Sequence, residues 1–78
     1  MIGETPASSS SSSVATVTGK GRIMFFYGGT SSVALNFNID GLGYKTIYIL
    51  NGMGVELYFN QSVSFYSAKS MYYVVQVE

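Results

Sequence analysis

Few side chains in this sequence are of the types that carry out nucleophilic, acid–base or metal chemistry. Its 78 residues include no histidine and no cysteine, which removes the commonest general base and the usual zinc ligands. After the first dozen residues, the only carboxylates are Asp40, Glu56 and Glu78, and catalysis by paired carboxylates needs two that converge. We therefore expect no catalytic residues, no metal site and no cofactor, and a protein that is not an enzyme.

Glycine-containing turn signals recur along the chain after residue 18. Asp40-Gly41 and Asn51-Gly52 are strong hairpin signals, because tight hairpin turns need positive φ at their central residues. The pairs Gly41/Gly43 and Gly52/Gly54 resemble fragments of phosphate-binding loops, but the following helix and the lysine or third glycine are missing. We interpret these pairs as turns.

Between the turns lie segments rich in β-branched and aromatic residues. The clearest alternates Val33, Leu35 and Phe37 with polar asparagines, the period of a strand with one buried face. No stretch shows the period of an amphipathic helix. The sequence predicts an all-β fold, a small antiparallel meander closed as a barrel or a two-sheet sandwich of about six to seven short strands. The candidate strands are 14–18, 22–27, 32–39, 44–50, 55–59, 62–66 and 71–77.

The N-terminal region has a different composition. Residues 1–12 are mainly Gly, Pro, Thr, Ala and Ser, and they contain most of the serine run Ser8–Ser13. Such a segment buries too little apolar surface to offset its ordering entropy. We predict a disordered, flexible arm or tether over residues 1–12 and an antiparallel β domain over residues 13–78. Removal of the arm is expected to leave thermal stability nearly unchanged.

The composition of the chain favours self-association. Charged residues make up 10% of the chain, against about 25% in ordinary soluble domains. A cysteine-free domain of this size has a marginal core and no disulfides to support it, so oligomerisation is the remaining support. The alternative is a monomer whose surface is wetted by serine, threonine and asparagine side chains and by tyrosine hydroxyls.

Several predicted strands carry apolar residues on both faces, which is usual for strands covered on both sides. One small β domain buries only one face of each sheet. If Val33, Leu35 and Phe37 face the core, the alternation within each strand leaves a second set pointing outward. Methionine and tyrosine are enriched at protein interfaces. The predicted interface residues are Met24, Phe26, Tyr48, Tyr58, Tyr66, Tyr72 and Val74.

These features favour a structural assembly protein, by analogy a small virion subunit such as a phage head-decoration, fibre or tail protein. Its expected partners are copies of itself, with a trimer as the favoured number, and a larger assembly such as a capsid or tail. We expect it in virions assembled in the host cytoplasm, since no secretion signal or membrane span is evident. The alternative is a carbohydrate- or other ligand-binding module that uses an exposed tyrosine face. Nucleic-acid binding is not expected, because the net charge is zero and such binding needs a cationic groove.

Overall fold

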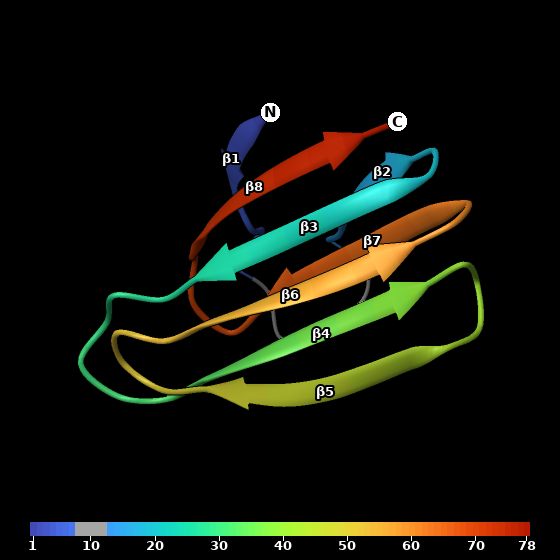
Figure 1. Cartoon of the computed structure of the whole chain (residues 1–78). Helices are drawn as coiled ribbons and strands as arrows, with labels where there is room; N and C mark the ends of the chain where they lie inside the picture. Colours follow the sequence, from blue (N-terminus) through green and yellow to red (C-terminus); the bar gives the residue numbers. More distant parts are fainter. Residues whose placement is uncertain (8–12) are drawn as a thin grey trace.

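The computed structural model describes residues 1–7 and 13–78, which form two stacked antiparallel sheets of four strands each (Figure 1). Sheet A has the order β1-β8-β3-β6 and sheet B the order β2-β7-β4-β5. The predicted all-β class is confirmed, and of the two predicted closures, barrel or two-sheet sandwich, the strands form the sandwich. The strands are β1 (Ile2–Glu4), β2 (Ala15–Thr18), β3 (Gly21–Phe26), β4 (Val33–Ile39), β5 (Tyr44–Ile49), β6 (Gly54–Phe59), β7 (Ser62–Ser67) and β8 (Tyr72–Val77).

The strand order differs from that of a meander. All seven predicted strands occur, as β2 to β8, but β4 and β5 are the only consecutive strands of the described chain that pair with each other. The short turns at residues 19–20 and 60–61 instead carry the chain from one sheet to the other, and Gly19 N donates a hydrogen bond to Gln61 O (2.8 Å). A tight turn reverses the direction of the chain, but it does not determine which strands share a sheet.

The core is a single layer between the two sheets. At its centre, the ring of Phe65 contacts Phe25 edge-on at 5.2 Å between centroids and Tyr73 at 4.9 Å. Ile23 and Leu35 are also fully buried. Phe25 and Tyr73 come from sheet A and Phe65 from sheet B, so this aromatic cluster joins the sheets and fixes which face of each strand points outward.

The segment before residue 8 is part of the sandwich, which differs from the flexible arm predicted for residues 1–12. β1 pairs with β8, and Gly3 lies under the ring of Tyr73, where a Cβ atom would come within 2.6 Å of the phenol oxygen. Beyond β1, Ala7 bridges to Ser67 of sheet B. Residues 8–12, which hold most of the serine run, lie outside the described residues. Removal of the N-terminal segment is therefore expected to destabilise the fold.

Thr5 anchors this segment in a buried hydrogen-bond network. Its hydroxyl accepts a hydrogen bond from Met71 N (3.0 Å) and shares one with the hydroxyl of Ser67 (2.6 Å). Its backbone N–H donates to Met71 O (2.9 Å), and Ser70 Oγ donates to its carbonyl oxygen (3.1 Å). The network ties the end of β1 to the loop between β7 and β8.

We predict that Thr5→Val lowers the free energy of unfolding by about 1–3 kcal/mol, because it leaves a buried N–H without its acceptor. Thr5→Ser keeps the hydroxyl and should lose much less. Urea denaturation of the two variants and the parent chain measures both effects. Equal stabilities for Thr5→Val and the parent would contradict an anchoring role for Thr5.

Asp40 holds two turns together at the opposite end of the strands from Thr5. It adopts a positive φ of 55°, and its carboxylate accepts hydrogen bonds from the backbone N–H groups of Asn60 (2.9 Å), Gln61 (2.6 Å) and Ser62 (3.2 Å). The hydrogen bond from Gln61, with those from Ser62 and Asn60, lowers the pKa of Asp40 below its ordinary value of 3.8. The turn role predicted for Asp40 thus includes a contact with a distant turn.

This contact makes the folding stability depend on pH in the acid range. The pKa of Asp40 is lower in the folded chain than in the unfolded chain, so Asp40 contributes fully to the free energy of unfolding above the unfolded pKa of 3.8. This contribution is lost as the pH falls through the folded pKa. Asn also tolerates positive φ, so Asp40→Asn should fold, with a smaller drop in Tm between pH 7 and pH 3 than the parent chain. Parallel Tm profiles for the two proteins would refute this assignment.

Candidate assembly surface

The described residues contain no cluster of side chains suited to metal chemistry. Nowhere in residues 1–7 and 13–78 do three Asp or Glu side chains come together as they would around a metal ion. The same residues form no helix that is long and apolar enough to cross a membrane. The outer faces of the two sheets carry exposed aromatic side chains, among them Phe26 and Tyr72 on sheet A and Tyr48 on sheet B.

The outer face of sheet A carries a continuous apolar stripe built from three strands. Cross-strand pairing places Ile2 of β1 beside Val74 of β8, and Val74 beside Met24 of β3. In the next row, Tyr72 of β8 lies beside Phe26 of β3. Ile2 is 75% exposed, Tyr72 62% and Phe26 48%. We call these five residues the apolar stripe, because they are contiguous on one face, whereas exposed apolar residues on protein surfaces are ordinarily scattered singly.

A polar cluster borders the stripe on β3, β6 and β8. The guanidinium of Arg22 donates hydrogen bonds to Gln76 Oε1 (3.0 Å) and Glu56 Oε2 (3.3 Å). The hydroxyl of Tyr58 donates to Glu56 Oε1 (2.6 Å). This hydrogen bond, together with the charge of Glu56, raises the pKa of Tyr58 above its ordinary value. The stripe therefore has a hydrogen-bonded polar rim on this side, as protein interfaces commonly do.

The outer face of sheet B combines hydroxyl and amide side chains with Tyr44, Tyr48 and Tyr66. Thr46 Oγ1 donates a hydrogen bond to Asn36 Oδ1, and the hydroxyls of Thr16 and Ser64 are joined by another. Cross-strand hydroxyl and amide pairs of this kind stabilise a sheet while remaining hydrated. The outer face of sheet B thus carries the residue types, hydroxyl and amide side chains with tyrosines, that the sequence analysis gave for the surface of a monomer.

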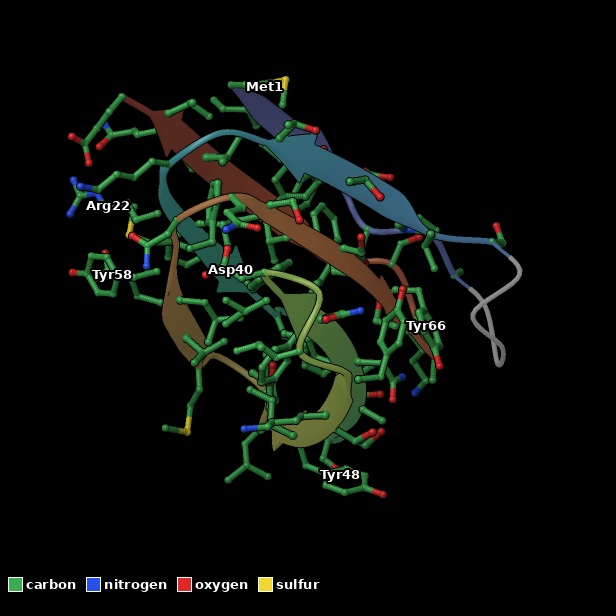
Figure 2. All side chains as sticks on the ribbon, turned by 90° about the vertical axis from the view of Figure 1, so that its right-hand side faces the viewer. Met1, Arg22, Asp40, Tyr48, Tyr58 and Tyr66 are labelled. Carbon is green, nitrogen blue, oxygen red and sulfur yellow. The ribbon has the colours of Figure 1, made fainter. Side chains whose placement is uncertain are left out.

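The seven predicted interface residues divide between these two faces. Met24, Phe26, Tyr58, Tyr72 and Val74 lie on the outer face of sheet A, and Tyr48 and Tyr66 on that of sheet B. Figure 2 shows Tyr58 and Tyr66 pointing to opposite sides of the sandwich. Tyr66 packs against Tyr44 with ring centroids 5.6 Å apart, whereas Tyr48 is 73% exposed.

The sequence analysis missed Ile2 as a member of the stripe. Ile2 belongs to a segment whose composition predicted disorder, and its neighbour Val74 is far away in the sequence. A lone isoleucine beside a methionine and a glycine carries no strand period, so no local signal identifies it.

A hollow of about 830 Å³ opens at one end of the stripe, between the loops that follow β3, precede β6 and precede β8. Phe26 and Tyr72 contribute to its wall, together with Gly28, Gly29 and Met71. Beneath Gly29, the hydroxyl of Tyr27 is buried and has no hydrogen-bond partner among the described residues. The hollow thus adjoins the stripe at Phe26 and Tyr72.

Comparison of the chain with models of protein families, with curated proteins and with solved structures found no match.

Proposed function

We propose that this chain is a non-enzymatic structural subunit that associates with a second copy of itself through the apolar stripe on sheet A. The observation that carries the proposal is the contiguity of Ile2, Val74 and Met24 with Tyr72 and Phe26 on one otherwise uncovered sheet face. Covering such a face removes apolar area from water at about 25 cal/mol per Å². In a domain with a thin core, this burial is a substantial stabilising contribution.

The chemistry of the stripe fits a second copy better than a charged partner. Its members carry no ionised group, and the neighbouring Arg22 and Glu56 already neutralise each other in an ion pair of 3.3 Å. A self-complementary surface needs this kind of internal balance, because two-fold association brings like residues close together. Beyond that ion pair, the strand residues on this face offer a strongly charged partner a single carboxylate, that of Glu4 beside Tyr72.

Ligand binding through an exposed tyrosine face is the second candidate. It requires Tyr48, Tyr58, Tyr66 and Tyr72 to share one platform, as sugars stack on adjacent aromatic rings. Tyr58 and Tyr72 lie on sheet A, whereas Tyr48 and Tyr66 lie on sheet B. The four tyrosines are thus not gathered on one surface, and we favour assembly.

The stripe can be tested with charge substitutions at its exposed members. We predict that Phe26→Asp and Tyr72→Asp each weaken self-association by about 100-fold or more, since burying an uncompensated carboxylate costs several kcal/mol and each 1.4 kcal/mol is a factor of ten in affinity. Sedimentation over a range of concentrations measures the dissociation constant.

Tyr48→Asp is the matched control. Tyr48 is as exposed as the stripe residues but lies on sheet B, so this variant should associate like the parent chain. Thermal melts of all three variants establish that they are folded. A parent chain that stays monomeric at high concentration, or equal weakening by Tyr48→Asp, would contradict the proposed surface.

We further propose that this subunit belongs to a larger particle such as a virion head or tail. The support is the combination of a small all-β fold, a low content of charged residues and an apolar outer face. The genomic neighbourhood tests the setting: genes for capsid or tail proteins should flank the gene, and an unrelated operon would argue against it.

A further inference from the structure

Each sheet of the sandwich ends in two edge strands, and these differ in how well they are protected. An edge strand presents unpaired backbone N–H and C=O groups that can pair with another chain. Proteins prevent such pairing with very short edge strands or with charged residues that point inward. The edges are β1 and β6 in sheet A and β2 and β5 in sheet B.

Three of the four edges carry one of these protections. β1 has three residues and β2 has four. β5 is longer, but Lys45 shares the inward-facing side of that strand with Ile47 and Ile49, opposite the buried Phe37. A charged side chain on the inward face of an edge strand disfavours the addition of another strand, because its charge would have to be buried.

β6 has neither protection. It has six residues, it pairs with β3 on one side, and it has no strand partner on the other among the described residues. Its inward side chains are Val55, Leu57 and Phe59, of which Val55 and Leu57 are incompletely covered. An added strand would finish their burial. β6 is therefore the edge at which sheet A can grow.

We propose that β6 pairs antiparallel with β6 of a second copy and joins the two A sheets into one continuous eight-stranded sheet. This inference rests on the proposed self-association and identifies a second contact for it. The pairing has two-fold symmetry, so it produces a dimer, whereas the sequence favoured a trimer.

The side chains of β6 select the register. Residues directly opposite each other in an antiparallel pair face the same side of the sheet. A register that pairs Val55 with Tyr58 would therefore place an inward apolar side chain on the same side as an outward one. Two registers keep the faces matched and pair most of the strand, one centred on Glu56 and one on Leu57. Centring on Glu56 places two carboxylates opposite each other, which is destabilising.

Centring on Leu57 gives complementary neighbours. It places Leu57 opposite its own copy and Val55 opposite Phe59 on the inner face. On the outer face it places Glu56 opposite Tyr58, whose hydroxyl already donates to this carboxylate within one chain. Each Glu56 also keeps its ion pair with Arg22 of the same chain, so no charge is left without a partner.

Edge pairing and packing of the apolar stripe are compatible. The two-fold axis of an antiparallel pair within a sheet is perpendicular to that sheet, so the outer faces of both A sheets point to the same side. A β6-linked dimer therefore presents two apolar stripes on one enlarged face, and two such dimers can pack face to face.

Single-cysteine cross-linking tests the register directly, because the natural chain has no cysteine. Glu56→Cys and Tyr58→Cys alter outward, exposed side chains. Opposite residues in an antiparallel pair lie about 4.5–5.5 Å apart between Cα atoms, within the range for a disulfide, whereas diagonal neighbours are about 7–8 Å apart. Under mild oxidation, we expect a covalent dimer when the two full-length variants are mixed and none when either is oxidised alone.

The outcomes separate this inference from the proposed function. A covalent dimer from Glu56→Cys alone would overturn the Leu57-centred register. No cross-link in the mixture, from a chain that sedimentation shows to be oligomeric, would overturn β6 pairing but leave association through the stripe standing. A trimer would also overturn β6 pairing, and a monomeric parent chain would overturn both proposals.

Discussion

The contact of Phe65 with Phe25 and Tyr73 is the interaction on which the rest of this molecule depends. This contact packs sheet A against sheet B, and the chain has no cysteines that could join the sheets by a disulfide instead. Once Phe25 and Tyr73 point inward, the pleat of β3 and β8 turns Met24, Phe26, Tyr72 and Val74 outward. The positions of the stripe residues on β3 and β8 thus follow from those of the core residues on the same strands.

The sequence predicts this alternation well, because each strand records it locally. Val33, Leu35 and Phe37 are buried as their period of two indicates, and Ile47 and Ile49 face inward while Tyr48 faces outward. What the sequence does not record is which sheet each strand joins. That depends on partners far apart along the chain, and for this reason Tyr48 and Tyr66 lie on a different face from the other five predicted interface residues.

The N-terminal segment illustrates the same limit more sharply. Gly3 and Glu4 have low β propensity, and three residues are fewer than a typical strand contains. The segment acquires order from β8 and from the buried hydroxyl of Thr5. Composition indicates the intrinsic tendency of a segment to form a strand. It does not indicate which pairing partners and hydrogen bonds the rest of the fold provides for that segment.

The pairing of β1 with β8 also bears on biosynthesis. β1 and its partner β8 lie far apart in the sequence, so β1 is synthesised well before β8. Contacts between such distant segments slow folding. Sheet A is incomplete until β8 has emerged, and Ile2 cannot lie beside Val74 before then. A nascent chain therefore carries only part of the apolar stripe, and the whole surface exists only on a chain translated through β8.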